Sequence, residues 1–451
     1  MKRTMTLLLV LIFSLGAWSQ GHAEDLLTVY QQTAATSPVL ARARALLDAD
    51  RASRPLAEAG LKPKLGASAG VSGNNVDIAG FGSDFGLPIS TDINKDYLGA
   101  SYSVTLTQPV LNGQAWVAVR AADAQIRAGQ AAVLATEQDL ILQVTQTYFD
   151  VLRAQANSRV ARGQRDLLKS VFDQAEAYLR VGSGDIIAVR EAGARMDAAE
   201  AARISAENEV RIARQRLERL THQPLEQLED LGPIQPEGPQ PNQVEPWKDA
   251  AKENQPILTQ AREQLQVAQD QVEIARRAHW PTVNLNAGYG YVKGSILPSV
   301  ESRQAQVGLN FFAPIYTGGE IRARTQQAGA QARATQHTLE ALQDQVNLDT
   351  ESAFLTLQNS VAQLQATRQA MESAQIAMEA TRKGYEIGDR SIIDLLTTIQ
   401  NYDSAQRSYY LALYNQVVAR VQLKAAAGVV SVKDLEAVNG LLKPVGEVSG
   451  S

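Results

Sequence analysis

Two long stretches without proline set the strongest limit on the fold of this 451-residue chain. No proline occurs between Gly113 and Val181, and none occurs between Gly318 and Ile387. Apolar residues in both stretches recur at steps of three and four, as along a coiled-coil seam. They are Ile141, Val144, Tyr148 and Val151, and then Leu339, Leu342, Val346, Ala353, Leu357, Val361 and Leu364. At a rise of about 1.5 Å per residue, each stretch predicts a helix of about 100 Å, far beyond the usual three turns.

Four shorter segments alternate between apolar and polar residues, as half-buried β-strands do. They are residues 65–72, 97–107, 282–292 and 303–312. In the third, Val283, Leu285, Ala287, Tyr289 and Tyr291 alternate with Asn and Gly. A length of about 8 to 11 residues suits a tilted strand that crosses a membrane. The alternation alone leaves the solvent of the apolar side open, since it predicts either a second sheet or lipid.

The chain repeats one plan of elements twice. The segment SPVLARARALLDA from Ser37 aligns with QPILTQAREQLQV from Gln255, and VGSGDIIAV from Val181 aligns with IGDRSIIDL from Ile387. Each half predicts a helix, a strand, a loop, a strand, a long helix, a Gly-containing break and a helix. The first half carries about a dozen extra residues in a Gly- and Asp-rich stretch at 74–96, which is predicted to be a surface loop.

The ends of the repeats predict five parts. Residues 1–23 have the pattern of a secretory signal peptide, with Lys2 and Arg3, an apolar run and the small residue Ala23 before the expected cut. The first structural repeat covers 24–231, and a Pro-rich linker covers 232–246, where closely spaced prolines rule out a helix. The second repeat covers 247–428, and a C-terminal segment covers 429–451.

Composition excludes several classes of protein. The formal charge is −5 at pH 7 and becomes more negative when the basic residues of the predicted signal peptide are lost, so nucleic acid is not expected as a partner. The chain has no cysteine, so disulfides, thiolate metal sites and a lipid-modified N-terminal Cys are not expected. No other stretch approaches 18 consecutive apolar residues, which argues against a helical membrane protein.

No motif predicts catalysis, a cofactor or a metal site. The histidines are His22, His222, His279 and His337, and none has metal-ligand spacing to another His or to a carboxylate pair. The GSGDI stretch after Val181 lacks the preceding strand that a phosphate-binding loop requires. The sequence therefore predicts a protein that is not an enzyme and that takes its energy for any transport from a partner.

A membrane sheet of four strands cannot stand alone. In hydrocarbon, unpaired strand edges leave backbone groups without hydrogen bonds at several kcal/mol each, so only a closed barrel is stable. Outer-membrane barrels begin at about eight strands. The predicted fold class is therefore mainly α with a membrane β-barrel portion. As a trimer, the duplicated long-helix chains complete a 12-stranded barrel and a 12-helix coiled-coil cylinder in the periplasm.

Four motifs, in this order, make the chain similar to the TolC family of outer-membrane efflux and secretion ducts. They are LTQPVLNG and APIYTGG, where strands lead into the long stretches, GYEIGDRSIIDLL, and KDLEAVNGLLKPV near the C-terminus. The resemblance covers essentially the whole chain after residue 23. It implies a homotrimer in outer-membrane lipid that extends into the periplasm. It also implies a periplasmic adaptor (membrane fusion) protein and an inner-membrane ABC or RND-type transporter as partners.

The resemblance further implies a gate at the periplasmic end. Tyr385, Arg390 and Asp394 match positions that form polar links between helix pairs in the family. The match is partial, because a partner aspartate of the family falls on Ala188 and a second ring aspartate falls on Thr397. Three residues before Ala188, Asp185 lies close enough in sequence to place a carboxylate on nearly the same helix face. We therefore expect Arg390 to pair with Asp185 or with Asp394 of a neighbouring chain, and Asp394 to form a ring of three carboxylates. Mutual repulsion in such a ring raises the apparent pKa.

The breaks at Val181, Gly182, Ile387 and Gly388 are predicted to be the helix tips that receive the adaptor, since Gly takes a positive φ at little cost. Each of these readings has a plainer alternative. Arg390 and Asp394 are spaced as an ordinary exposed helix pair, and the breaks are also compatible with plain helix ends. A periplasmic or surface coiled-coil structural or adhesion protein explains the helices, but it does not explain the duplicated strands. Protein secretion and small-molecule efflux both remain open as the transport task.

Overall fold

The computed structural model describes residues 24–78, 93–225, 227–232, 234–294 and 301–443. The predicted signal peptide lies outside the described residues, as do 79–92 of the predicted loop and 444–451 of the C-terminal segment. The chain forms two compact units that cut across both sequence repeats. Among the described residues, one unit contains those within 24–38, 137–251 and 349–443, and the other contains those within 39–136 and 252–348. The domain boundaries drawn from the repeats stay a prediction.

Both long helices form. Helix α3 (Gly113–Arg180) has 68 residues and α7 (Glu320–Glu386) has 67. The predicted seam is buried at Val144, Tyr148 and Val151, which are fully enclosed, whereas Leu342 and Val361 are half-buried. The prediction from the proline-free stretches is therefore confirmed within two residues at each end.

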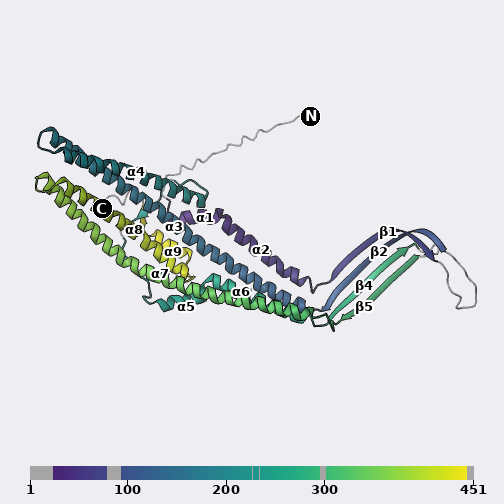
Figure 1. The fold of residues 1–451 in the computed structure, drawn as a ribbon. Coiled ribbons are helices and arrows are strands. Elements are labelled where there is room, and N and C mark those ends of the chain that lie inside the picture. Colours follow the sequence, from purple (N-terminus) through teal and green to yellow (C-terminus); the bar gives the residue numbers. More distant parts are fainter. Residues whose placement is uncertain (1–23, 79–92, 226, 233, 295–300, 444–451) are drawn as a thin grey trace, which may run out of the picture. The chain divides into compact units, whose positions relative to one another are not determined.

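The second unit contains a four-stranded antiparallel sheet with the order β1-β2-β4-β5 (Figure 1). Its strands are β1 (Lys64–Ile78), β2 (Ile93–Leu111), β4 (Thr282–Lys293) and β5 (Glu301–Phe312). All four predicted strands are confirmed. The predicted loop at 74–96 is wrong at its ends, because β1 continues to Ile78 and β2 begins at Ile93. Asn75 there donates a hydrogen bond to Asp96 across the strand pair (2.7 Å), so polar residues extend the ladder.

One side of this sheet is apolar across all four strands. The register aligns Leu65 with Leu106, Leu106 with Ala287, and Ala287 with Val307. These side chains lack a covering layer in the single chain: Leu65 is 74% exposed and Val307 is 77% exposed. Ser, Thr, Asn, Gly and Gln occupy the alternate positions on the opposite side. The alternation therefore gives two faces, as predicted, and an apolar face that this chain does not bury itself.

The same unit packs α2 (Pro38–Glu58) and α6 (Pro256–Arg277) beside the first turns of α3. Arg120 Nε of α3 donates to Asp270 Oδ1 of α6 at 2.8 Å, and Arg127 pairs with Glu263 at the same distance. The two pairs lie seven residues apart on each helix, which is the repeat of an antiparallel coiled-coil contact. Thus α3 and α6 keep a fixed register through charged side chains.

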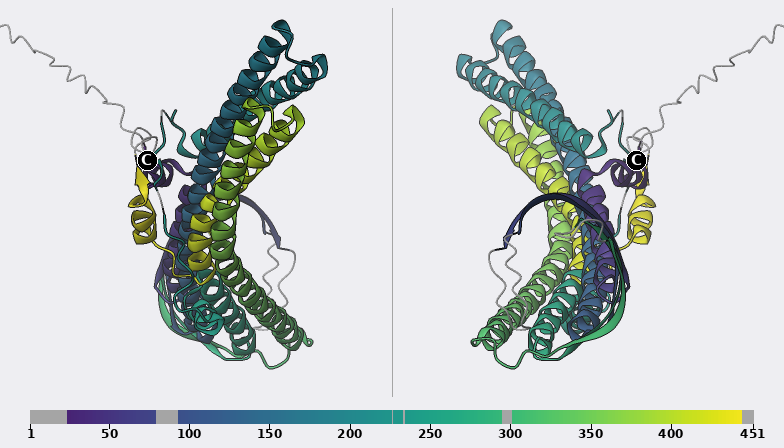
Figure 2. Two further views of the ribbon diagram at one scale, coloured as in Figure 1. Left: turned by 90° about the vertical axis from the view of Figure 1, so that its left-hand side faces the viewer. Right: turned by 90° about the vertical axis from the view of Figure 1, so that its right-hand side faces the viewer.

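The first unit contains two helical hairpins, which Figures 1 and 2 show as α4 alongside α3 and α8 alongside α7. It includes α1 (Leu26–Thr36), α4 (Ile186–Thr221), α8 (Ile392–Ala426), α9 (Val432–Asn439), and the short strands β3 (Asp230–Leu231) and β6 (Leu442–Lys443). Helix α5 (Val244–Asn254) begins inside the stretch predicted as a linker and ends in the second unit. The described residues contain no helix long and apolar enough to cross a membrane.

A buried polar cluster joins β3 to the hairpins in the first unit. Asp230 is 4% exposed and accepts a hydrogen bond from the Tyr414 hydroxyl of α8 at 2.9 Å. Arg159 of α3 donates to its other carboxylate oxygen at 2.7 Å. Tyr148 donates to the Glu229 carbonyl oxygen at 2.9 Å. Burial raises the pKa of both tyrosine hydroxyls, so they act as neutral donors.

Candidate functional site

The candidate site lies at the tips of the two hairpins, where α3 turns into α4 and α7 turns into α8. In the first tip, α3 ends at Arg180, and Gly182 takes a φ of +78°. The Tyr178 carbonyl oxygen accepts hydrogen bonds from the N–H groups of Ser183 and Gly184, both at 3.0 Å. Asp185 then caps α4, and its carboxylate accepts from the Ile187 N–H at 3.1 Å.

The second tip repeats this turn 206 positions later. Gly388 takes a φ of +82°, and the Gly384 carbonyl oxygen accepts from the N–H groups of Asp389 (2.8 Å) and Arg390 (3.2 Å). A capping box starts α8, in which Ser391 and Asp394 satisfy each other's backbone N–H groups. The predicted Gly breaks are therefore tight turns between antiparallel helices. Their role in receiving an adaptor stays a prediction.

A glycine has exchanged places between the two turns. The first turn has Tyr178 and Gly184 at the positions that Gly384 and Arg390 occupy in the second turn. A Cβ on Gly184 would lie 2.8 Å from the Tyr178 carbonyl carbon, and a Cβ on Gly384 would lie 2.7 Å from Arg390 Cγ. Each turn therefore has room for one side chain at this crossing. The second turn gives that room to Arg390, and Gly384 is the residue that makes it available.

Aromatic rings connect the two tips within the chain. The ring of Tyr385, a predicted gate residue, lies 6.4 Å from the ring of Tyr178, centroid to centroid, at an angle of 56°. Burial, with a smaller effect of Tyr178, raises the pKa of the Tyr385 hydroxyl, so it stays protonated near neutral pH. Residues of both tips line a cavity of about 600 Å³ that includes Tyr178, Asp185, Tyr385 and Arg390.

The three predicted charged gate residues are exposed and do not form an ion pair with one another in the part of the chain that the structure describes. Asp185 does not lie on the face of α4 as expected, because it is the N-cap and has an extended backbone. Hydrogen bonds from Ser391 lower the pKa of Asp394, and the positive charge of Arg390 lowers it further. This is opposite to the direction expected for a carboxylate ring, which requires neighbouring chains. Pairing of Arg390 between chains therefore stays a prediction.

An apolar core lies next to the tips. It joins all four helices of the two hairpins, and Leu395, Ala192 and Ile399 are almost fully buried in it. The core also includes Leu168, Val171, Ala175, Val189, Ala199, Met378, Ile392 and Leu396, with Tyr385 packed at its edge. In contrast, Val181 and Ile387 at the turns are 75% and 81% exposed. Each tip thus presents an exposed apolar residue at its turn, next to a packed apolar core.

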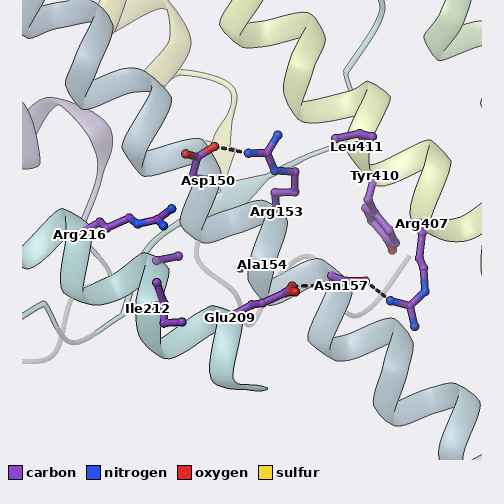
Figure 3. A pocket seen from close by; sticks show the side chains of 11 residues that line it. Asp150, Arg153, Ala154, Asn157, Glu209, Ile212, Arg216, Arg407, Tyr410 and Leu411 are labelled. Atoms are coloured by element: carbon purple, nitrogen blue, oxygen red, sulfur yellow. Dashed lines mark hydrogen bonds and ion pairs between the residues drawn. The ribbon is translucent and has the colours of Figure 1, made fainter. Parts of the chain in front are cut away.

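A second hollow of about 430 Å³ lies between α3, α4 and α8 (Figure 3). Asp150 and Arg153 of α3 pair with each other on one side of it. On another side, Arg407 of α8 donates to Asn157, whose amide donates to Glu209 of α4 at 3.3 Å. These contacts tie the hairpins together. The described residues contain no group of His, Asp and Glu arranged to hold a metal ion.

Sequence analysis missed Gly384, Ser391 and Tyr178 as parts of the tips. The spacing of Ser391 and Asp394 at the start of a helix is a readable capping-box signal. The relation of Gly384 to Arg390 has no local signal, because the close approach is made across a turn whose geometry only the structure supplies. Aligning the two repeats in full would have shown the exchanged glycine.

The chain is similar to known proteins over most of its length. Residues 29–222 and 247–429 match the outer membrane efflux protein family. The outer membrane protein TolC of Vibrio cholerae is 29% identical over 427 residues, covering 93% of this chain and 94% of that protein. The alkaline protease secretion protein AprF of Pseudomonas aeruginosa is 28% identical, covering 97% and 91%. The Campylobacter jejuni CmeC outer membrane channel has a similar fold, with a TM-score of 0.78, 17% identity and coverage of 93% and 90%.

Proposed function

The chain belongs to the outer membrane efflux protein family, and on that premise we propose that it is a passive exit duct that works as a homotrimer. It is an outer-membrane channel protein that extends into the periplasm. Three chains close one β-barrel in the outer membrane and continue it as a helical tube. The single observation that carries the proposal is the four-stranded sheet whose apolar face is exposed and whose outer strands β1 and β5 have no further partner among the described residues.

The apolar band on this sheet runs obliquely to the strands. Near the ends of the strands farthest from the helices, the apolar face becomes polar at Asn75 on β1 and Asp96 on β2, but at Lys293 on β4 and Arg303 on β5. The register pairs Asn75 with Asp96, Ala100 with Lys293, and Tyr291 with Arg303. From β1 to β5, this boundary therefore shifts by six residues along the strands.

The opposite boundary shifts the same way. It passes from Leu65 and Leu106, which are paired, to Val283 and Phe311, which are paired four residues nearer the helices. Shifts of about 13 and 20 Å along the strands, over about 14 Å across three strand spacings, give a slope of roughly 40–55°. A level band of lipid produces this slope when strands tilt by a similar angle, and outer-membrane barrel strands tilt by about 35–45°. Lipid contact explains the slope, whereas a soluble sandwich has no reason to keep it.

A trimer removes both open edges by pairing β5 of one chain with β1 of the next. Unpaired backbone groups in hydrocarbon cost several kcal/mol each, so association and membrane insertion depend on each other. At the other end of the duct, Arg390 and Asp394 form the gate together with Tyr385 and Asp185. The exposed Val181 and Ile387, with Gly182 and Gly388, receive a periplasmic adaptor. An inner-membrane ABC or RND-type transporter supplies the energy.

Protein secretion and small-molecule efflux share this design. The family name supports efflux, and the similarity to a protease secretion protein supports type I secretion. Deletion of the gene, followed by profiling of secreted proteins and of drug sensitivity in the same strain, separates the two tasks. The result assigns the cargo and leaves the duct itself unaffected.

Two neighbouring positions of β5 test the duct. Leu309 lies on the apolar face and Asn310 lies on the opposite face. A Lys on the lipid face near the bilayer midplane costs about 2–4 kcal/mol, whereas a Lys in a water-filled lumen costs little. Leu309→Lys should therefore sharply reduce heat-modifiable trimers in the outer membrane, and Asn310→Lys should leave their yield near that of the wild type. Equal yields for both variants, or a soluble periplasmic monomer in the wild type, contradict the proposal and favour a coiled-coil scaffold.

A further inference from the structure

We infer that the end of the apolar sheet face farthest from the helices holds a phosphorylated lipid headgroup through Arg303 and Lys293. The inference rests on the proposed function, which places this face in lipid and this end of the sheet at the outer leaflet. The ligand class is a lipid with a phosphate on its headgroup, whose acyl chains lie on the apolar rows below.

Both basic residues lie on the apolar side of the sheet. Arg303 pairs with Tyr291 across β4 and β5, and it precedes Ala305 and Val307 on the same side of β5. Lys293 follows Tyr291 by two residues on β4 and therefore shares its side. Their side chains are 69% and 65% exposed. Two cations thus end the apolar rows of the strands that carry them.

The cost of burying charge in lipid fixes the level of these residues. A basic side chain on the lipid face is strongly unfavourable at the bilayer midplane and nearly neutral at the interface. Tyr291, two residues before Lys293 on β4, lies near this level, as aromatic girdle residues do at membrane interfaces. The rings of Tyr102 and Tyr291 are stacked at 5.0 Å, and Tyr289 lies 6.5 Å from Tyr102. The Arg303 guanidinium carbon lies 5.8 Å from the centre of the Tyr291 ring, which orients the guanidinium over that ring.

The cluster has a surplus of positive charge. Glu301 faces both cations, but its carboxylate oxygens lie 3.8 Å from Lys293 Nζ and 3.8 Å from Arg303 Nη2. Both distances exceed that of a hydrogen bond, so donors of both side chains are still available. Asp96 shares the face, but it lies four residues beyond Ala100, the residue paired with Lys293. That separation is about 13 Å along the strand, more than a Debye length at physiological salt. Asp77, on β1, lies farther still.

Phosphate fits this arrangement better than other outer-leaflet groups. The planar guanidinium fork of Arg303 binds two phosphate oxygens at once, and Lys293 adds a compact charge beside it. A phosphate monoester carries about −1.5 to −2 charges near neutral pH, enough to neutralise the surplus left by Glu301. The apolar rows below the cations, which include Val307 and Leu309, are exposed and contact acyl chains. A headgroup bound by the cations and chains bound by the sheet identify the occupant as a lipid.

The test measures lipid affinity of the full-length protein purified in a neutral detergent. A spin-labelled phosphatidic acid is the probe, and inorganic phosphate is the competitor that lacks chains. The variant is Arg303→Gln with Lys293→Gln. The matched control is Lys95→Gln, since Lys95 lies near the same end of β2 but on the opposite face, paired with Val76. Each basic side chain near an anionic lipid surface contributes about a fivefold gain in affinity, so the double variant should bind about 25-fold more weakly.

The inference holds if the double variant loses this affinity, Lys95→Gln retains it, and both variants remain trimers of wild-type heat stability. Three outcomes overturn it. In the first, Lys95→Gln loses as much affinity as the double variant, which indicates a general charge effect. In the second, inorganic phosphate displaces the probe at equal concentration, which indicates a simple anion site. In the third, the double variant loses trimer stability in lipid-free detergent, which indicates that Arg303 pairs with a neighbouring chain at the β5 edge. A monomeric wild type refutes the proposed function separately, because that result does not depend on lipid affinity.

Discussion

Asp394 forms part of the helix cap at the tip of the second hairpin and is also the proposed gate charge, and one substitution separates the two. Its carboxylate accepts hydrogen bonds from the Ser391 hydroxyl (2.8 Å) and the Ser391 N–H (3.2 Å), and its own N–H donates to the Ser391 hydroxyl (3.1 Å). An Ala at position 394 therefore removes the proposed gate charge and the helix cap together. Asp394→Asn removes the charge and keeps an oxygen that accepts both hydrogen bonds.

Ser391→Ala is the converse variant. It leaves the Asp394 charge and removes the capping hydroxyl, at a cost of about 1 kcal/mol for a typical N-cap. That cost is about a fivefold shift toward a frayed first turn of α8 in each chain. If the charge ring forms the gate, Asp394→Asn should reduce cation selectivity and increase conductance of the purified channel in planar bilayers. Ser391→Ala should then raise the frequency of opening and leave selectivity unchanged.

The refuting result is specific. If Asp394→Asn has wild-type selectivity and conductance while Ser391→Ala opens the channel, Asp394 acts only as a helix cap and the constriction lies elsewhere. Arg390→Ser completes the set. It should increase conductance if Arg390 links neighbouring chains, and it leaves the capping box intact because Arg390 precedes the cap. The temperature at which heated trimers dissociate provides the stability control for all three variants.

Three further predictions concern acid and packing. The pKa of Asp394 lies below its ordinary 3.8 in the single chain. The cap is therefore fully present above pH 3.8 and is lost only as the pH falls below that value. Acid-induced opening of the bilayer channel that begins at higher pH would show that repulsion in the ring dominates. Gly113→Ala places a Cβ 2.9 Å from the Trp280 ring and should destabilise the trimer by about 1–3 kcal/mol, measured by heat dissociation. Its control is Gly163→Ala, which has open space around it and should be neutral or stabilising. Tyr414→Phe removes a hydrogen bond to the buried Asp230 carboxylate and should lower trimer stability by about 1.5 kcal/mol. The loss stays this small because Asp230 keeps its hydrogen bond from the Leu231 N–H. An unchanged dissociation temperature would contradict that value.

The elements of this fold could be predicted because each has a strong one-dimensional signal. Strands that separate lipid from water keep a strict period of two, and helices of nearly 70 residues exclude proline throughout. The strand ends at 74–96 were lost because Gly, Asn and Asp predict a loop wherever backbone pairing is ignored. The buried Asp230 cluster was also missed. Its members lie on α3, β3 and α8, and an aspartate before a linker has no sequence signal that announces a tyrosine and an arginine from distant helices.

The tips show why the gate residues were harder to assign than the fold. At both tips a carboxylate helps to cap the following helix: Asp185 is the N-cap of α4, and Asp394 forms the capping box of α8 with Ser391. Both carboxylates accept hydrogen bonds at these caps, and each retains lone pairs for a second donor. Arg390 occupies the one place in the turn that Gly384 leaves open, and the first repeat fills the equivalent space with Tyr178 and a glycine. The duplication has thus produced one turn that presents an aromatic ring inside the chain and one that presents a cation to solvent. Arg390 forms no ion pair with another described residue, and its pairing with an acceptor on a neighbouring chain stays a proposal.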